Sequence, residues 1–343
     1  MSIFAILLDK LQRREDLTVD EASGAMAEIM EGRAQPSNIA ALLVGLSMKG
    51  ERPSEIVGLA RAMRRRATPL PFKGDAPEVF DTCGTGGDGA ETFNVSTAAA
   101  LVVAACGVTV AKHGNRSVSS RCGSADVFEA LGVRIDAPPD VAVRCLEEAG
   151  IAFLFAPTFH PSMRHAGPTR KELGIRTAFN LLGPLTNPAG AARQLVGVPR
   201  PELTELVARS LGMLGTSRAW VVHGADGLDE LSTTGYSKVS EYRDGAVNTF
   251  YVHPSEFGIA KSSRADLRGG DAETNAGIIR ALLDGSPGPQ RDIVLYNTAA
   301  SLLIAGRAAT LAEGLVLAAH AVDSGRAREV LARVAALSQG QAA

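Results

Sequence analysis

The stretch DTCGTGGDGAETFNVST, residues 81–97, holds the residues of this sequence that are best suited to chemistry. Gly84 to Gly89 follow the pattern G-x-G-x-x-G, in which backbone N–H groups can approach a ligand closely. Asn94, Ser96 and Thr97 then stand at the start of an Ala/Val-rich segment that we expect to be a helix. The free N–H groups of a helix start form an anion site, so the sequence predicts a ligand that contains phosphate.

Two better-known glycine motifs and a purely structural turn are the alternatives. In a dinucleotide fingerprint the third glycine opens the helix, and an acidic residue follows about 20 positions later. Here Ala90 to Asn94 come before the helix, and Ala111, Lys112 and His113 occupy the later positions. No Gly-Lys-Ser/Thr follows, which disfavours a Walker loop. A third interpretation is that the glycines form only a tight turn and that Ser96 only caps a helix. It is less favoured, because four glycines and three polar residues at the helix start fall within fourteen consecutive positions.

A second polar loop, KHGNRSVSSRCGSAD, follows the predicted strand VTVAK. In an open parallel sheet, ligands bind at the carboxyl ends of the strands, so this loop and the glycine turn should flank one crevice. Two neighbouring phosphate cradles suit a ligand with two separate phosphate groups.

The elements that position these loops fall into two parts. Residues 1–70 have helical periodicity, with a capping box at Thr18 and Glu21 and helix stops at Gly32 and Gly50. Residues 68–77 hold three prolines and a glycine and form the best candidate linker. Beyond them strands and helices alternate, which indicates an α/β domain with a mostly parallel sheet flanked by helices. The predicted domains are residues 1–72, all helical, and 73–343.

Composition limits the possible partners. The 343 residues carry a net charge of −2, so no general attraction to nucleic acid or an anionic membrane is expected. No apolar run approaches the ~18 residues of a membrane span. The four cysteines show no C-x-x-C spacing, which disfavours a zinc site and favours reduced thiols in the cytoplasm.

The segments GTGGD, NVST, KHGNRSVSS, GSADVFEALG and the block HPSMRHAGPTRKELGIRT occur in an order and spacing that resemble the anthranilate phosphoribosyltransferases of tryptophan biosynthesis. The resemblance continues to VVHGADGLDELS and covers nearly the whole chain. It implies a small helical domain joined to a larger α/β domain, and a homodimer formed through the helical domains. It also implies that residues around 160–190 cross back to the helical domain.

The resemblance implies transfer of the phosphoribosyl group of 5-phosphoribosyl-1-diphosphate to the amine of anthranilate, with release of diphosphate. The residues that it assigns to phosphoribosyl diphosphate are Gly84, Gly87, Asp88, Thr92, Asn94, Val95, Ser96, Thr97, Lys112, His113, Gly114, Asn115, Arg116, Ser117, Val118, Ser119, Ser120 and Ser124. Backbone amides, hydroxyls and a lysine ammonium are suitable partners for phosphate oxygens.

The same resemblance assigns Mg²⁺, two ions per active site, to Asp229 and Glu230, with Ser96 as a third ligand. Mg²⁺ prefers a few oxygen ligands plus phosphate and water, which this acidic pair could supply in part. The alternative is that Asp229 and Glu230 are simply solvated on a surface loop, as adjacent acidic residues more often are. Arg170 is assigned to the anthranilate carboxylate, with Asn115 and Gly84 lining the same pocket. Its expected walls are His113, Ala156, Pro157 and His160.

No residue is assigned as a catalytic acid or base, because an arylamine is already unprotonated near neutral pH. The nearest alternative is a pyrimidine-nucleoside phosphorylase, which would lack the block around Arg170. A non-catalytic nucleic-acid binder would show a basic surface and eroded motifs, and the sequence shows neither. Cys83 and Cys122 depart from the family pattern, which has a small apolar residue and a serine there, and we expect both to be neutral packing residues.

Overall fold

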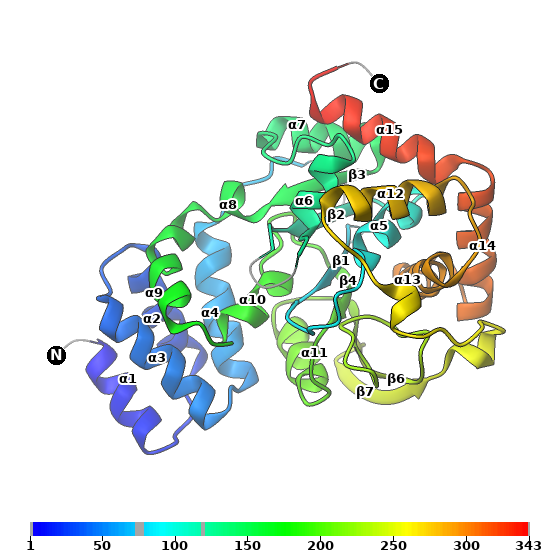
Figure 1. Ribbon diagram of the computed structural model, residues 1–343. Coiled ribbons are helices and arrows are strands. Elements are labelled where there is room, and N and C mark those ends of the chain that lie inside the picture. The colour runs from blue at the N-terminus through cyan, green and yellow to red at the C-terminus, as the bar shows by residue number, and fades with distance from the viewer. Residues whose placement is uncertain (1–2, 73–78, 118–120, 342–343) are drawn as a thin grey trace.

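The computed structural model describes residues 3–72, 79–117 and 121–341, and it shows a small helical part beside a larger α/β part (Figure 1). Val118, Ser119 and Ser120, which were predicted to bind substrate, lie outside the described residues. No helix of the described chain is long and apolar enough to cross a membrane.

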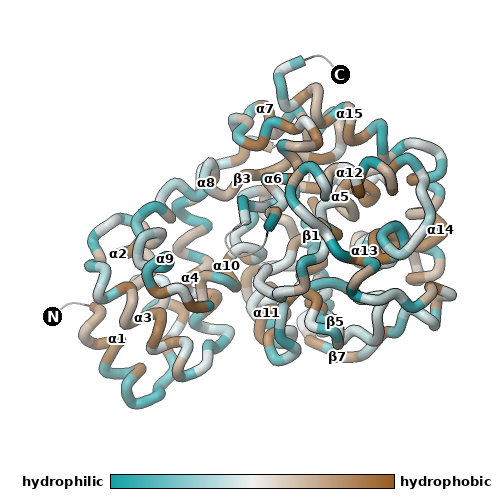
Figure 2. Tube along the Cα trace, viewed as in Figure 1, coloured by the Kyte–Doolittle hydropathy of each residue, from teal (hydrophilic) through white to brown (hydrophobic). Residues whose placement is uncertain are grey.

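The helical part consists of α1 (Ile3–Gln12), α2 (Val19–Met30), α3 (Pro36–Lys49) and α4 (Pro53–Arg66). The predicted capping box is confirmed, because Thr18 accepts from the N–H of Glu21 while Glu21 accepts from that of Thr18. Gly50 follows α3 at a φ of 89°, which favours glycine. Brown, hydrophobic segments lie along these helices in Figure 2. Short helices of this kind are stable only when such faces are packed together.

The α/β part is built on a seven-stranded sheet with the order β3-β2-β1-β4-β5-β6-β7. The first five strands in this order are parallel, and β6 and β7 continue the sheet as an antiparallel hairpin. The predicted mostly parallel sheet is therefore confirmed. The strands are β1 (Phe80–Gly84), β2 (Val110–Gly114), β3 (Ile151–Phe155), β4 (Arg193–Gly197), β5 (Arg218–Gly224), β6 (Ser237–Arg243) and β7 (Ala246–Val252).

Helices cover the sheet. The helix α5 (Val95–Ala105) is almost entirely buried and contacts β1, β2 and α13 (Pro289–Ala305), while α11 (Leu203–Met213) contacts β5 and β6. The remaining α-helices are α6 (Ser124–Ala130), α7 (Pro139–Arg144), α8 (Ala156–Phe159), α9 (Gly167–Leu173), α10 (Phe179–Leu185), α12 (Ala272–Leu283), α14 (Leu311–Asp323) and α15 (Arg326–Ser338).

The segment from α9 to α10 joins the two parts. The helix α9 contacts α3, and α10 contacts α4 (Figure 1). Ala166, Ala178 and Phe179 belong to one apolar cluster with residues of α1 to α4. The guanidinium of Arg64 donates to the backbone oxygens of Leu185 and Leu214, at 2.7 and 3.2 Å, and so ties α4 to the ends of α10 and α11.

Candidate active site

A cavity of about 820 Å³ lies where the carboxyl ends of the parallel strands face the helical part. Segments from five regions of the chain line it, and every predicted substrate or metal residue that the structure describes is among them. These residues are Gly84, Gly87, Asp88, Thr92, Asn94, Val95, Ser96, Thr97, Lys112, His113, Gly114, Asn115, Arg116, Ser117, Ser124, Arg170, Asp229 and Glu230. Sequence-distant loops therefore share one concavity.

The glycine turn after β1 packs directly against the acidic loop after β5. The backbone N–H of Gly86 donates to Oδ2 of Asp229 at 2.8 Å. A Cβ atom at Gly84 would collide with the Asp229 carboxylate, so a larger residue at this position would displace that side chain. Gly86, Gly87 and Gly89 all have positive φ, and the turn thereby adopts a conformation that other residues rarely accept.

Glu230 and Lys112 meet at the start of α5. The N–H of Ser96 donates to Oε1 of Glu230 at 3.1 Å, which places a carboxylate at the positive end of the helix. The ammonium of Lys112 is buried and donates to the backbone oxygen of Thr82 at 2.5 Å and to Oγ of Ser96 at 3.4 Å. Ser96 therefore lies between a cation and an anion.

Burial perturbs the ionisable groups of this region. Desolvation, and then the negative charge of Asp88, raises the pKa of Asp229 to about 7. Desolvation, and then the charge of Asp229, raises the pKa of Glu230 to about 8. Burial also lowers the pKa of Lys112, against the attraction of Asp81. The half-buried Asp229 and the buried Glu230 are adjacent carboxylates with raised pKa values, which is typical of a functional site because a bound cation would stabilise their charged forms.

The loop after β2 is held by α6. Oδ2 of Asp126 accepts from the N–H of Gly123 at 2.8 Å and from that of Ser117 at 3.2 Å. The guanidinium of Arg116 pairs with Asp126 and Glu129. Arg116 lies at the cavity, but in this state its charge is already paired with α6 rather than free for a phosphate.

Another part of the cavity lining consists of aromatic rings and a guanidinium. The rings of His113 and His160 meet edge to face with centroids 5.1 Å apart, and burial lowers the pKa of His113 to about 3. The guanidinium carbon of Arg170 lies 4.9 Å from the ring centroid of Phe179. The neutral imidazoles, Phe179 and the Arg170 cation together suit a flat aromatic acid.

Several lining residues were missed at the level of sequence. Arg176, Phe179, Asn180 and Thr186 come from the segment that returns to the helical part, and Met63 comes from α4. Arg176 lies within the block that supported the resemblance, and its charge was the available signal. Met63 and Phe179 carried no such signal, because their apolar types also suit a core.

The chemistry of the donors fits Mg²⁺ bound together with phosphate. Asp229, Glu230 and Ser96 supply hard oxygen ligands, and neither carboxylate forms an ion pair with any described residue. Among the described residues, no cluster of three or more His, Cys, Asp and Glu side chains forms a complete metal cage. A site with few protein ligands agrees with the preference of Mg²⁺ for water and substrate phosphates.

Comparisons with known proteins cover almost the entire chain. Residues 76–328 match the glycosyl transferase family, a/b domain, and residues 5–67 match the glycosyl transferase family, helical bundle domain. The chain is 56% identical to an anthranilate phosphoribosyltransferase of Moorella thermoacetica, over 98% of both chains. It is 50% identical to that of Methanocorpusculum labreanum, over 99% of both.

Solved structures agree with these matches. A crystal structure of anthranilate phosphoribosyltransferase from Thermus thermophilus has a TM-score of 0.91 and 45% identity, and covers 97% of this chain and 99% of that one. The Saccharomyces cerevisiae enzyme in complex with PRPP and Mg has a TM-score of 0.89 at 27% identity, and covers 98% of each chain. By sequence, domain composition and fold, the chain belongs to the anthranilate phosphoribosyltransferase family.

Proposed function

We propose that this enzyme transfers the phosphoribosyl group of 5-phosphoribosyl-1-diphosphate to the amine of anthranilate, giving N-(5-phosphoribosyl)anthranilate and diphosphate in tryptophan biosynthesis. The observation that carries the proposal is the single cavity that holds the glycine turn, the lysine loop, the acidic pair and Arg170. One end offers anion cradles and oxygen ligands, and the other offers apolar rings and a guanidinium.

In this proposal the glycine turn and the start of α5 bind the diphosphate, and the loop from Lys112 to Ser124 binds the ribose phosphate. Both segments follow the carboxyl ends of parallel strands, β1 and β2, where such ligands gather. Lys112 acts through its buried charge, because its ammonium is held against Thr82 and Ser96 at the base of the cavity.

Asp229, Glu230 and Ser96 would hold Mg²⁺, and two ions per active site is part of the proposal. When bound, the metal neutralises charge that develops on the departing diphosphate. The chain itself positions the arylamine beside the anomeric carbon, excludes water and stabilises charge in the transition state. No proton-abstracting side chain is needed, since the nucleophile is neutral, and the strongly lowered pKa of His113 agrees with an imidazole that stays uncharged.

Arg170→Gln should raise the KM for anthranilate by about 10- to 100-fold, because a charged hydrogen bond of about 1.5–3 kcal/mol is lost. The KM for phosphoribosyl diphosphate should change little, which steady-state kinetics with each substrate varied in turn would measure. Arg164→Gln is the matched control, since Arg164 also lines the cavity but has no aromatic partner among the described contacts. Equal anthranilate KM values for wild type and Arg170→Gln would contradict the assignment.

The activity itself is tested by the loss of anthranilate fluorescence on mixing enzyme, Mg²⁺ and phosphoribosyl diphosphate, with each component omitted in turn. Only the complete mixture should show the loss. A phosphorolysis assay with thymidine or uridine should be blank. Phosphorolysis without loss of anthranilate would instead support the nucleoside phosphorylase alternative.

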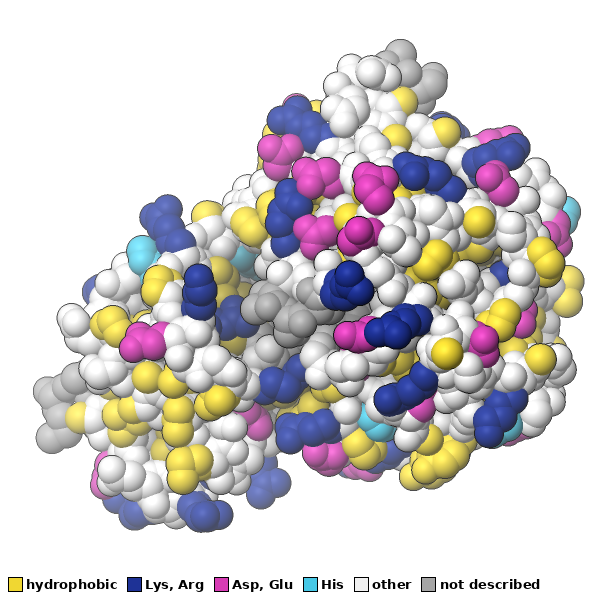
Figure 3. Space-filling model, in the orientation of Figure 1, with side chains coloured by type: hydrophobic (Ala, Val, Ile, Leu, Met, Phe, Trp, Pro, Cys, Tyr) yellow, Lys and Arg dark blue, Asp and Glu magenta, His cyan; other side chains and the backbone are white. Residues whose placement is uncertain are grey.

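The proposed domains are residues 1–72 and 73–343, with the segment near 160–190 contributing to the helical domain, and the proposed location is the cytoplasm. We also propose a homodimer through the helical domain. Hydrophobic side chains gather over α1 and α3 on the face shown in Figure 3, and Ile6 and Met48 are 48% and 74% exposed. Exposed apolar patches of this kind mark protein interfaces.

The double variant Ile6→Glu/Met48→Glu should convert the dimer to a monomer, because charges would be buried in an apolar interface. Size-exclusion chromatography with light scattering would report the mass. The control is Tyr236→Glu/Tyr251→Glu, which changes two other exposed side chains, one just before β6 and one on the edge strand β7. A dimer that survives the first change and dissociates with the second would place the interface elsewhere.

A further inference from the structure

Arg176 is a cavity residue whose guanidinium is only partly used by the protein. Its Nη1 donates to the backbone oxygen of Gly86 at 2.6 Å. Its Nη2 is buried and has no hydrogen-bond partner among the described residues. A buried donor without an acceptor is costly, and charged donors more so. The free N–H groups therefore indicate a ligand that brings an acceptor oxygen to this point.

The position of Arg176 joins the two parts of the molecule. It lies between α9 and α10, on the segment that packs against α3 and α4, yet it reaches the turn after β1. A Cβ atom at Gly87 would collide with its Nη1, so the guanidinium lies directly against the turn. The Gly86 residue is thus held through both of its backbone polar groups, because its oxygen accepts from Arg176 and its N–H donates to Asp229.

The electrostatic surroundings identify which end of the cavity Arg176 serves. Burial, and then the like charge of Arg200, lowers the pKa of Arg176, while Asp229 and Asp88 act in the opposite direction. Arg176 therefore lies at the acidic end with the proposed metal ligands, whereas Arg170 lies over Phe179 at the aromatic end. An acceptor oxygen that binds Arg176 beside these carboxylates would come from a ligand that carries several negative charges, because such a ligand could be held there by a bound metal ion.

We propose that Arg176 binds an oxygen of the diphosphate through Nη2 while Nη1 fixes the glycine turn that cradles the same group. The inference rests on the proposed function. It adds to that function a residue that binds the diphosphate and positions the glycine turn, from the segment packed on the helical domain. Binding at this point would draw that segment and the α/β domain onto one ligand.

The test is titration calorimetry of inorganic diphosphate with Mg²⁺, combined with steady-state kinetics, on wild type, Arg176→Gln and Arg176→Lys. Arg176→Gln should weaken diphosphate binding and raise the KM for phosphoribosyl diphosphate by about 10- to 100-fold. The KM for anthranilate should change by less than about threefold, which a general loss of structure would not produce. The diphosphate affinity of Arg176→Lys should lie between those of wild type and Arg176→Gln, since lysine keeps the positive charge but loses the planar pair of guanidinium N–H donors.

Arg200→Gln is the matched control, because Arg200 is an exposed neighbouring arginine that does not line the cavity, and it should leave both KM values unchanged. Diphosphate affinity within about twofold of wild type in Arg176→Gln, or a change confined to anthranilate, would overturn the inference. If Arg176→Gln does not fold, Arg176→Lys decides by the same criteria. A wild type that binds diphosphate but transfers nothing to anthranilate would refute the proposed function and leave this inference standing.

Discussion

The double variant Asp229→Asn/Glu230→Gln should lose turnover by on the order of 10³-fold, the effect of removing the oxygen ligands that hold a charge-neutralising cation. The Mg²⁺ concentration for half-maximal rate should rise, because neutral amides bind the ion more weakly. The folded state should be retained, since the variant removes two adjacent carboxylates that repel one another. Activity assays over a range of Mg²⁺ and thermal unfolding would measure the two effects separately.

Asp266→Asn is a suitable control for this variant. Asp266 is an exposed acid that caps the loop at Ser263 and does not line the cavity. Its replacement should leave turnover and Mg²⁺ dependence as in wild type. Wild-type kinetics in the double variant would refute the metal assignment, and unfolding of the double variant would mean that the pair is structural.

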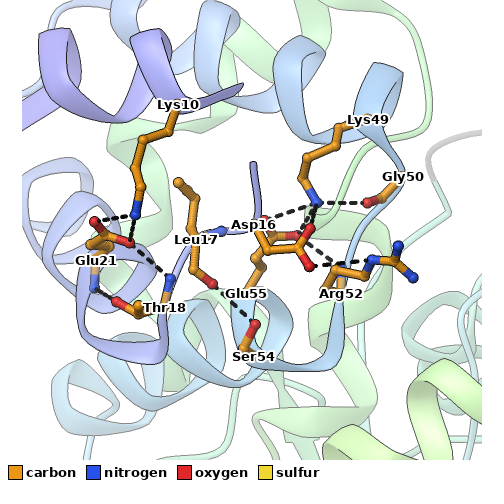
Figure 4. A network of polar contacts seen from close by, with 10 residues as sticks. All are labelled: Lys10, Asp16, Leu17, Thr18, Glu21, Lys49, Gly50, Arg52, Ser54 and Glu55. Atoms are coloured by element: carbon orange, nitrogen blue, oxygen red, sulfur yellow. Dashed lines mark hydrogen bonds and ion pairs between the residues drawn. The ribbon is translucent and has the colours of Figure 1, made fainter. Parts of the chain in front are cut away.

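Glu55→Ala should destabilise the protein by about 2–5 kcal/mol, because the buried N–H of Leu17 loses its acceptor and the Lys49 ammonium keeps only Asp16 and the backbone oxygen of Gly50 as partners. Figure 4 shows the network: the Glu55 carboxylate accepts from the N–H groups of Leu17 and Arg52 and from the Lys49 ammonium. The side chains of Glu55 and Lys49 are 0% and 4% exposed. The network joins the α1–α2 loop to the turn between α3 and α4. Denaturant unfolding of the full chain would measure the change.

Glu28→Ala is the control for Glu55→Ala. Glu28 pairs with Arg33, whose side chain is 54% exposed, and a surface pair of this kind contributes about 0–1 kcal/mol. The free energy of unfolding of Glu55→Gln should lie between those of Glu28→Ala and Glu55→Ala, because glutamine keeps an acceptor for the Leu17 N–H but loses the negative charge. A Glu55→Ala variant as stable as Glu28→Ala would show that the buried pair contributes no more than a surface pair.

The sequence alone determined those helix ends and strands whose formation depends on residues close together in the chain. The capping box at Thr18 and Glu21 and the helix stop at Gly50 depend only on near neighbours, and the structure confirms them. The strand β2 was predicted from the short apolar run VTVAK. The hairpin of β6 and β7 was missed, because its mixed polar and apolar residues follow a pattern that only pairing with β5 explains.

The sequence also determined which residue types could bind phosphate, a cation and an aromatic acid, since glycines, carboxylates and arginines carry that chemistry in any fold. The tertiary structure alone decided how they meet: the N–H of Gly86 donates to Asp229 across 143 positions of the chain, and Arg176 donates to the oxygen of the same residue from a segment packed on the helical part. It also decided that Arg116 is paired with α6. These contacts could not be predicted from the sequence, because they form between segments that are distant in the chain. Only after those segments have packed together are the side chains removed from water and brought within hydrogen-bond distance of one another.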